Sequence, residues 1–577
     1  MNWFIKNNYL NSITAACVIV LFAVVMSFEN KIAIDGDARD YYSYLVSLFI
    51  DHNFTHQVGN DWFLIETPTG TINVHTIGVS ILQAPFFFCA LIFSKLFGYA
   101  SNAFSAPFQI GIYFAGIFYC TLGLIFTRRV LQQLNIKPIY ITTLIILCCF
   151  GTHLFNYTVN EPGMPHVYAF ALTSTLFYTV LNLFQKRKAK YFYLSAVVFG
   201  LIILVRPVNA ILLVFIPFFF QNRFDMLSTL KVLVRSKHLY FSFFVLIAVC
   251  SIQSLAWYFQ NGKLLQDSYA GNGFYFSDPQ IIKMLFGFNN GLFIYVPLCF
   301  LFLFGSISIL MNNKFKGIVF IVSIAIIFYI FASYWAYNYF DGIGIRTFVD
   351  FLPVFVIAGA YMLQNFSPKL KYAVSALSFL FLAVNLFHIY QYRNGILKGN
   401  GMNFEKYSYV FLKTDKLYGD SLGGANELPL YSKTGRKLLF DNKINGVYQQ
   451  LAYDSVYNFK NVEYGAGYDY KITKKSNSFF IVAEFERKET SKNSSYNALI
   501  NLNASNTTNK SKLYLAYRLN DIPSKDCCDW KKCTLSIGVT GKFEQDDKLS
   551  FFIWNKDKKD FLIKNLNLKI FDYSYNI

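Results

Sequence analysis

The chain has 577 residues, of which 54% are hydrophobic and 15% are charged, and its mean hydropathy is +0.35. This apolar load excludes a soluble globular chain, because repeated apolar runs of about 20 residues are long enough to cross roughly 30 Å of hydrocarbon. The formal net charge of +19 gathers in short loops, such as QKRKAK at 185–190. Lys and Arg in short loops mark the cytoplasmic side of a membrane protein, so this charge does not indicate nucleic-acid binding.

The sequence predicts a mostly α-helical, polytopic transmembrane bundle of about 11 spans. The spans are the apolar runs at about 11–28, 108–127, 139–155, 165–184, 191–205, 207–220, 238–258, 291–310, 316–334, 346–364 and 371–390. A further apolar run at 76–97 conflicts with Arg128 and Arg129, which belong inside. We therefore predict that it is re-entrant or interfacial, which places the N-terminus inside and the C-terminal tail outside. Counting it as a span gives 12 and the opposite location for the tail.

The first outer loop, at about 30–75, is acidic. Within it, Asp35, Asp37 and Asp40 lie within six residues. Apolar and aromatic residues at helical spacing follow on one face: Tyr41, Leu45, Leu48, Phe49 and His52. This pattern predicts a short helix on the membrane surface. Carboxylates held at a lipid headgroup usually have a function, and the alternative is a solvated loop after a transmembrane helix.

Three further pieces face outside in this topology, at 156–166, 259–290 and 334–346. The outer pieces hold the aromatics, glycines, carboxylates and histidines, whereas the inner connectors are rich in Lys and Arg. We therefore expect the chemistry on the outer face. The aromatic residues of 259–290 suit a sugar or a prenyl chain, but an interfacial aromatic belt explains them as well.

From about residue 391 the composition changes, and Asn, Lys, Ser and Asp rise. Short apolar or alternating segments predict strands at 479–485, 513–519, 535–539, 549–554 and 562–571. We predict two domains: a transmembrane domain at 1–390, and an extracytoplasmic β-sandwich-like domain at 391–577. The spacing does not decide whether the second domain binds glycan or is a structural accessory.

The ten cysteines show no metal-binding spacing. Most lie in apolar runs and are interpreted as small core residues. Cys527, Cys528 and Cys533 lie in the polar tail, where a disulfide to Cys533 is expected if the tail is extracytoplasmic.

Several motifs follow one another in the first 390 residues. They are DGDARDYY at 35–42, NVHTIG at 73–78, APFF at 84–87, EPGMPH at 161–166, LFG at 285–287, GLF at 291–293, Trp335 and GIGIR at 342–346. Their order and shared outer placement resemble the GT-C class of integral-membrane glycosyltransferases. In particular, the motifs resemble the family that is similar to protein O-mannosyltransferases and bacterial lipid A or polysaccharide-modifying transferases. The resemblance covers about residues 1–390.

The resemblance implies an extracytoplasmic active site above a helical bundle and a sugar donor carried on a polyprenyl phosphate. It also implies that an Asp of the first outer loop activates the acceptor. The best match to that Asp is Asp37, with Asp35 and Asp40 as neighbours. The physical chemistry agrees, because sugar transfer to a hydroxyl needs a base. A second carboxylate and partial desolvation both raise the pKa of such a base.

The leaving polyprenyl phosphate needs positive charge. Arg206 in LVRPVN and Arg346 in GIGIRTF lie at span ends that we place outside, and a guanidinium suits bidentate phosphate contact. Gly342 and Gly344 let the backbone approach closely near Arg346, whereas Pro207 suggests a helix break beside Arg206. The alternative for both arginines is a snorkelling side chain that anchors a helix end.

Glu161 and His166 open the second outer loop, in an irregular turn rich in Pro and Gly. In the resembling class such a loop assists the acceptor or a metal, and the alternative is an ordinary polar loop. His75 is a further candidate for contact with phosphate or acceptor. Oxygen ligands of this kind suit a divalent cation, Mg²⁺ or Mn²⁺. No cluster has strong metal spacing, however, so no cofactor is certain.

We predict a membrane glycosyltransferase that transfers a hexosyl or pentosyl group, with inversion, from a polyprenyl-phosphate sugar to a glycan, lipid or protein acceptor. The frequent Lys, Asn, Ile and Phe suggest an AT-rich bacterial gene and therefore the inner (cytoplasmic) membrane. One alternative is a non-enzymatic flippase or transporter of lipid-linked glycans, which would typically show internal repeats and mid-span ionisable residues. Another is an assembly or anchoring protein in which the β domain is the functional part.

Overall fold

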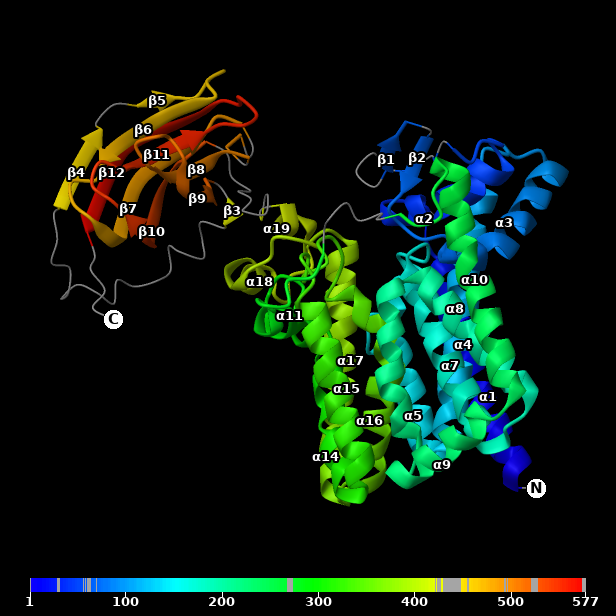
Figure 1. The fold of residues 1–577 in the computed structure, drawn as a ribbon. Helices are drawn as coiled ribbons and strands as arrows, with labels where there is room; N and C mark the ends of the chain where they lie inside the picture. Colours follow the sequence, from blue (N-terminus) through cyan, green and yellow to red (C-terminus); the bar gives the residue numbers. More distant parts are fainter. Residues whose placement is uncertain are drawn as a thin grey trace. The chain divides into compact units, whose positions relative to one another are not determined.

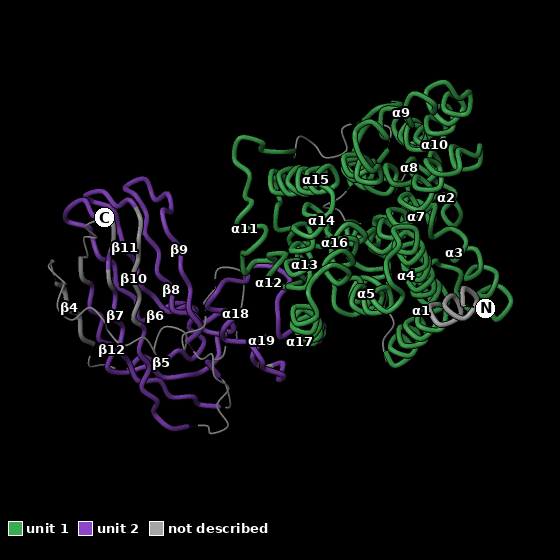
Figure 2. Tube along the Cα trace, turned by 90° about the horizontal axis from the view of Figure 1, so that it is seen from below, with its two compact units in different colours: residues 1–389 green, residues 390–577 purple. Residues whose placement is uncertain are grey.

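The computed structural model describes residues 2–28, 32–55, 57, 59, 64–68, 70–266, 273–420, 422, 427–428, 448–453, 456–491, 494–495, 497–519 and 528–572. The chain divides into two compact units, residues 1–389 and residues 390–577, which we call unit 1 and unit 2 (Figure 2).

Unit 1 is built mainly of helices (Figure 1). In chain order the α-helices are α1 (Asn2–Met26), α2 (Asp37–Phe49), α3 (Gly78–Phe97), α4 (Ala106–Gln133), α5 (Pro138–Phe150), α6 (Leu154–Val159), α7 (Pro165–Lys186), α8 (Ala189–Val205), α9 (Arg223–Val234), α10 (Lys237–Asn261), α11 (Ile281–Phe286), α12 (Leu292–Tyr295), α13 (Pro297–Leu303), α14 (Gly305–Asn312), α15 (Lys314–Ala332), α16 (Leu352–Asn365) and α17 (Pro368–Arg393), whose last residues belong to unit 2. Two 3₁₀ helices, η2 (Pro207–Phe219) and η3 (Arg346–Phe351), join them, and β1 (Leu64–Thr67) pairs with β2 (Gly70–Asn73) in an antiparallel hairpin.

Proline stands in the first turn of α4, α5, α7, η2, α13 and α16, where its missing N–H costs no hydrogen bond.

The described residues contain seven helices that are long and apolar enough to cross a membrane: α3, α4, α7, α10, α15, α17 and the continuous stretch of η3 and α16. An eighth span results if η2 and α9, which are bent by 114°, count as one. Shorter apolar helices are Asn11–Met26, α5, α8 and the stretch Pro297–Asn312. These are the helices of an integral membrane protein. The count of 11 spans is not confirmed by helix length and composition and stays a prediction.

The segment predicted to be re-entrant or interfacial forms one continuous 20-residue helix, α3. It contains Pro85 and still satisfies the length and hydropathy expected of a span. An unbroken helix differs from a re-entrant loop, which needs a reversal of the chain. Figure 1 shows α3 beside α2, at the end of unit 1 that carries β1 and β2 and opposite the end that carries α9. Its interfacial placement stays a prediction.

The core of unit 1 lies around α7 and α16. Of their apolar stretches, 83% and 89% are buried inside the protein, against 17% for α10. Helix α7 packs closely on α4 because Gly123 leaves room for the ring of Phe170, as small residues do between membrane helices. Central helices therefore position the buried polar groups described below, whereas α10 is peripheral.

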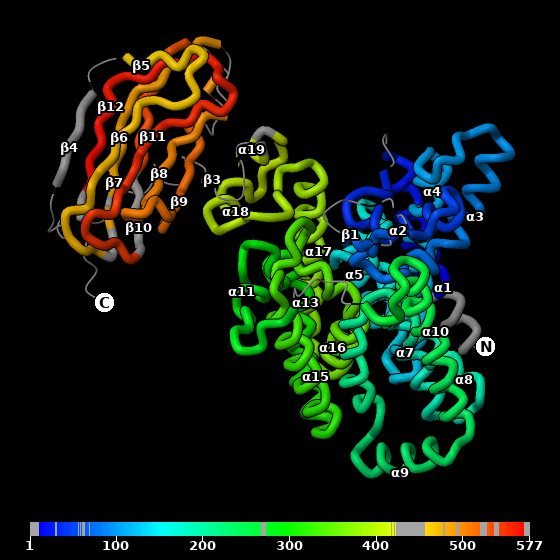
Figure 3. Tube along the Cα trace, turned by 45° about the horizontal axis from the view of Figure 1, so that its top comes forward, coloured from blue at the N-terminus to red at the C-terminus, as the bar shows by residue number. Residues whose placement is uncertain are grey.

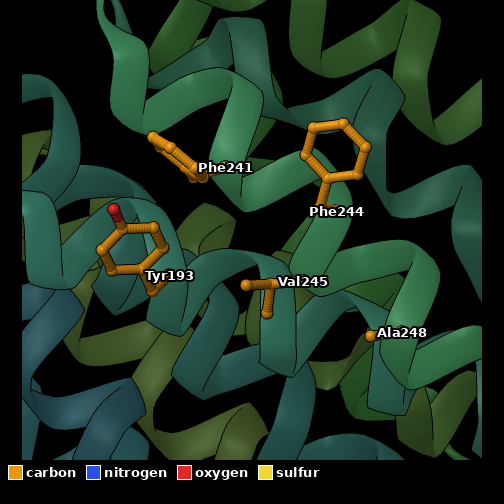
Figure 4. Close-up of a pocket in the computed structure, with 5 residues that line it drawn as sticks. All are labelled: Tyr193, Phe241, Phe244, Val245 and Ala248. Carbon is orange, nitrogen blue, oxygen red and sulfur yellow. The ribbon is translucent and has the colours of Figure 1, made fainter.

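An apolar depression lies on the surface between α8 and α10 (Figure 4). Its lining residues are Tyr193, Phe241, Phe244, Val245 and Ala248. Because this part of α10 is apolar and largely exposed, the depression has the character of a lipid-facing surface and supplies no acid or base.

The described residues of unit 2 include ten strands, which form two five-stranded sheets (Figure 3). The strands are β3 (Glu427–Leu428), β4 (Tyr448–Tyr453), β5 (Tyr457–Asn458), β6 (Tyr464–Lys471), β7 (Ser476–Glu489), β8 (Leu499–Ser505), β9 (Ser511–Arg518), β10 (Trp530–Phe543), β11 (Lys548–Trp554) and β12 (Phe561–Asp572). One sheet has the order β10-β7-β12-β4 with β5 also on β12, and the other has the order β3-β9-β8-β11-β6. Two short helices, α18 (Phe404–Val410) and α19 (Lys416–Asp420), precede the strands.

Alternating side chains of both sheets share one core, which contains Ile481 of β7, Leu502 of β8, Phe551 of β11 and Leu568 of β12. The predicted strand-rich domain is confirmed, and each of the five strand segments predicted from the sequence lies within a strand of the structure, apart from single residues at strand ends. A shared core between two sheets is the arrangement of a sandwich.

The disulfide expected at Cys533 is wrong, because Cys533 on β10 is a partly buried thiol outside any disulfide, and its Sγ donates to the backbone oxygen of Lys531. Cys528 is disulfide-bonded, and Cys527 lies outside the described residues. Five other cysteines, Cys17, Cys120, Cys148, Cys149 and Cys299, are buried and free, as expected of small core residues.

We expect Gly305→Val to destabilise unit 1 by about 2 kcal/mol, the usual cost of overpacking. A Cβ atom at Gly305 would lie 1.9 Å from the backbone oxygen of Ala358, so α14 and α16 would have to separate. Thermal unfolding in detergent measures the effect. The control is Ile307→Val on the exposed side of α14. Equal stability of the two variants would contradict this account of the α14–α16 contact.

Candidate functional site

The site begins where the chain leaves α1. The backbone N–H groups of Ala33 and Ile34 donate to Gln109 Oε1 of α4, at 2.8 and 3.0 Å, which fixes the segment before α2. Gly36 has a φ of 54°, a value that glycine adopts without strain, and α2 starts at the next residue, Asp37.

The short helix predicted in the first loop is confirmed as α2, but its predicted lipid-facing side is only partly right. Tyr41 and Leu45 are buried, whereas Leu48, Phe49 and His52 are exposed. Most of α2 is buried, and Asn73 Nδ2, at the end of β2, donates to the backbone oxygen of Asp40 at 2.7 Å. The helix is therefore packed into unit 1 on several sides, which a surface amphipathic helix would not be.

The central contact of the site joins α2 to η3. Arg346 Nη2 donates to Asp37 Oδ2 at 2.8 Å, and about a fifth of each side chain is exposed. Arg346 follows two glycines with positive φ, Gly342 at 145° and Gly344 at 62°. A Cβ atom at Gly344 would lie 2.2 Å from the His153 ring. The close backbone approach expected from the glycines before Arg346 is therefore present.

The pKa of Asp37 is lowered. Burial alone would raise it, but the Arg346 guanidinium, with a contribution from His75, outweighs the burial. The sequence predicted a raised pKa, and this prediction is wrong for two structural reasons. The cation comes from a residue 309 positions away, and the neighbouring carboxylates do not join the pair.

Those neighbouring carboxylates lie elsewhere. Asp35 is exposed and its Oδ1 accepts a hydrogen bond from the backbone N–H of Gly36 at 2.9 Å. Asp40 is fully buried, with its Oδ1 against Gly59, where a Cβ atom would meet it at 2.6 Å. Of the three predicted acids, the structure thus brings only Asp37 to Arg346.

A second, deeper cluster is centred on Asp350, one helical turn after Arg346 in η3. Asp350 has no exposed surface. Its Oδ2 accepts from Asn209 Nδ2 at 2.7 Å and from Arg206 Nη1 at 3.2 Å, and its Oδ1 accepts from His166 Nδ1 at 2.9 Å. Because a carboxylate only accepts, His166 carries its proton on Nδ1 here. Asp350 therefore fixes both Arg206 and His166.

The two clusters form one site. Asp37 interacts electrostatically with His75 and His166, and Arg346 does so with Glu161. Glu161 Oε1 also accepts from Asn156 Nδ2 of α6 at 3.1 Å. Loops and helix ends from α2, β2–α3, α6–α7, α8–η2 and η3 thus converge on two arginines and three carboxylates.

The aromatic segment at 334–340, which follows α15, covers part of this site. The guanidinium of Arg206 lies 5.9 Å from the ring centre of Tyr339, which stacks on Tyr334. Asn290 Nδ2 holds the segment by donating to the backbone oxygen of Phe340 at 2.6 Å. In the 259–290 loop, Tyr269 and Gly271 lie outside the described residues.

His75 is buried, and its ring stacks on Tyr41 with 4.3 Å between ring centres. Burial lowers its pKa from 6.5 to about 4 although Asp37 acts to raise it. The imidazole is therefore neutral near pH 7. This changes what His75 can do at a phosphate, because a neutral ring offers a hydrogen bond but no charge.

Sequence reasoning missed Asp350, Asn209 and Tyr157. Tyr157 packs edge-on against His166, with 4.9 Å between ring centres. Asp350 had a usable signal, since a carboxylate within the apolar run FVDFLPVF is costly unless it has a partner or a function. Asn209 and Tyr157 had none, because a polar side chain in a helix is common.

The predicted metal ligands do not form one ligand group. Asp37 contacts Arg346, His166 contacts Asp350, and Asp35 is exposed. Among the described residues no three His, Cys, Asp or Glu side chains are grouped so that they could hold a metal ion. The Mg²⁺ or Mn²⁺ considered from the sequence does not fit this arrangement, and we derive no step through it.

The chain matches no protein-family model and no curated protein. Among solved structures it is similar to the archaeal oligosaccharyltransferase AglB from Archaeoglobus fulgidus in complex with an inhibitory peptide and a dolichol-phosphate. The two are 12% identical with a TM-score of 0.38, over 70% of this chain and 57% of that chain. The A. fulgidus oligosaccharyltransferase in its apo form is 13% identical with a TM-score of 0.38, over 71% of this chain and 58% of that chain. Its complex with Zn and sulfate is 12% identical with a TM-score of 0.37, over 69% of this chain and 54% of that chain. The chain thus spans less than three fifths of these chains, and at such TM-scores we base no argument on the likeness.

We expect Asp350→Ala to destabilise the protein by about 3 kcal/mol, because it leaves Arg206 and His166 buried without their shared carboxylate. Asp35→Ala, at an exposed carboxylate, should change stability by less than about 0.5 kcal/mol. Thermal unfolding in detergent compares the two. A stable Asp350→Ala protein would show that Asp350 does not hold this cluster.

His75 should make stability depend on pH. Its folded pKa of about 4 lies below the ordinary 6.5, so the unfolded chain takes up the proton first as the pH falls. The contribution of His75 to the free energy of unfolding is fully present above pH 6.5, and it is lost as the pH falls from about 6.5 to about 4. His75→Asn should flatten that part of the curve of unfolding temperature against pH. The exposed-site control His52→Asn should follow wild type, and parallel wild-type and His75→Asn curves would contradict the prediction.

Proposed function

We propose that this chain is a membrane glycosyltransferase of the GT-C type that transfers a sugar from a polyprenyl-phosphate donor to an acceptor. The observation that supports it is the contact of Asp37 with Arg346 beside the Arg206–Asp350–His166 cluster. An acid–base group and two guanidinium groups at one site suit transfer away from a phosphate. The motifs that resemble this class supply Asp37, Arg346 and His166, whereas Arg206 and Asp350 lie outside those motifs.

Arg346 and Arg206 have the role of binding the donor phosphate. Arg206 is held by the fully buried Asp350, so its guanidinium is positioned before the substrate arrives. Arg346 begins the same 3₁₀ helix that carries Asp350. The two cations therefore move little relative to each other, which suits a leaving group that gains negative charge as the sugar–phosphate bond breaks.

Asp37 has the role of base. The acceptor hydroxyl attacks the anomeric carbon as its proton passes to the Asp37 carboxylate, and the bond between that carbon and the phosphate oxygen breaks. The products are the glycosylated acceptor, polyprenyl phosphate and protonated Asp37. One in-line displacement inverts the anomeric configuration. Glu161, which interacts with Arg346, and His166 are the further residues to which we assign contact with the acceptor.

The proposed setting is the bacterial inner membrane, with the site and unit 2 on the extracytoplasmic side. Supporting this, α2, which carries Asp37, lies at the end of unit 1 opposite α9 (Figure 1). Helix α9 begins at Arg223, and Arg235 and Lys237 stand where α9 leads into α10. Basic connectors belong inside. Unit 2 then serves as an accessory domain outside, and the transferred unit is a hexosyl or pentosyl group.

The test is a radiolabel transfer assay with purified protein and a panel of polyprenyl-phosphate sugars. Wild type should transfer or release sugar, and Asp37→Asn should lower the rate at least about 100-fold, as loss of a general base does. Asp35→Asn removes the same charge two residues away, at an exposed site, and should retain activity. Thermal unfolding confirms that each variant is folded.

Two results would contradict the proposal. Turnover that survives Asp37→Asn would remove Asp37 as the base. Tight binding of the lipid-linked sugar without turnover of any donor would instead favour a flippase or transporter of lipid-linked glycans.

A further inference from the structure

The two arginine–carboxylate contacts of the site differ in how easily they can be broken. Asp350 has no exposed surface and accepts from three residues. Asp37 and Arg346 meet through one oxygen and one nitrogen at 2.8 Å, with 20% and 19% of their side chains exposed. Separating Asp350 from Arg206 breaks a buried charge pair, whereas the outer pair can exchange its contact for water or a ligand at much lower cost.

The side chain of Asp37 has open space beside it, although the backbone around it is held in place. Asp37 is the first residue of α2 and follows Gly36, whose φ is 54°. No atom lies within 4 Å of the point where a Cβ of Gly36 would be. The Asp37 side chain, one-fifth exposed, can therefore turn away from Arg346 towards solvent while the buried helix, including Ala38, stays in place.

An incoming phosphate cannot share Arg346 with Asp37 without repulsion. Arg346 already interacts with the carboxylates of Asp37 and Glu161. A third negative group at the same guanidinium adds like charge at short range, which is unfavourable in a partly buried site. Departure of one of the three anions relieves this repulsion, and the Asp37 side chain, which meets Arg346 through one oxygen and is one-fifth exposed, is able to turn away.

We propose that binding of the donor phosphate displaces Asp37 from Arg346, and that this exchange releases Asp37 to act as the base. The inference rests on the proposed function. In the structure the proposed base is held by the residue proposed to bind the leaving group. Arg206 stays fixed on Asp350 and marks the phosphate position in both states.

The exchange makes donor binding precede activation of the base. While Asp37 is on Arg346, the guanidinium keeps the Asp37 pKa low, so the carboxylate is a weak base. Once the phosphate holds Arg346, that attraction is lost and the carboxylate becomes a stronger base. The acceptor is therefore activated only when a donor is present, which suppresses attack by water or acceptor on an incomplete site. The transfer itself is the displacement already given: the acceptor oxygen bonds to the anomeric carbon, its proton goes to Asp37, and polyprenyl phosphate leaves on Arg346 and Arg206.

The test measures binding of farnesyl phosphate, a short prenyl phosphate, to the full chain in detergent by calorimetry. Because Asp37 competes with the phosphate for Arg346, Asp37→Asn should bind it about tenfold more tightly than wild type. Arg346→Gln should bind it about tenfold more weakly. Asp35→Asn controls for the general loss of one negative charge and should lie within about twofold of wild type. Asp37→Ser is a second variant that removes the same carboxylate, in case Asp37→Asn does not fold.

The outcomes separate this inference from the proposed function. Binding that needs Arg346 but is unchanged or weaker in both Asp37 variants would overturn the exchange and leave the transferase proposal standing. Equal tightening in Asp35→Asn and Asp37→Asn would also overturn it, because the effect would then be long-range charge alone. Absence of farnesyl phosphate binding in wild type and all variants would contradict the phosphate-binding role itself, and the exchange with it.

Discussion

The contact between Arg346 and Asp37 joins two parts of the chain that are 309 residues apart. It ties the loop after the first helix to the start of the η3–α16 span, and the other groups of the site gather around it. Its geometry depends on the backbone on both sides. Gly36 places Asp37 at the start of α2, and Gly344 allows the chain before Arg346 to lie against His153, where any larger residue would collide.

The deeper cluster gives the site its rigidity. A buried carboxylate without partners would be very costly, but Asp350 is surrounded by donors from α7, α8–η2 and η2. Removing any one of them would leave charge or hydrogen-bonding capacity unmet. The same η3 helix thus carries one arginine that is exposed enough to meet a ligand, and one carboxylate that holds the other arginine in place.

The membrane and β-sheet elements were largely predictable from local patterns, because each pattern reports on its own segment. Apolar runs became helices α4, α7, α10, α15 and α17, and alternation in the tail became strands such as β7 and β12. Span counting was less successful. The run at 207–220 forms a 3₁₀ helix that bends by 114° into α9, and the run at 291–310 is divided among α12, α13 and α14. Hydropathy measures how apolar a run is and carries no information on where the helix breaks.

The sequence by itself determined the class of the molecule, an integral membrane chain with a strand-rich C-terminal unit, because hydropathy and alternation are properties of single segments. It also pointed to Asp37, Arg346, Arg206, His166, Glu161 and His75. Only the tertiary structure decided how these residues combine. Arg346 contacts Asp37, Asp350 holds Arg206 and His166, and Asp35 and Asp40 lie outside the ion pair. The physical reason is that the pKa and charge of each group are set by neighbours distant in sequence, which no local pattern can contain.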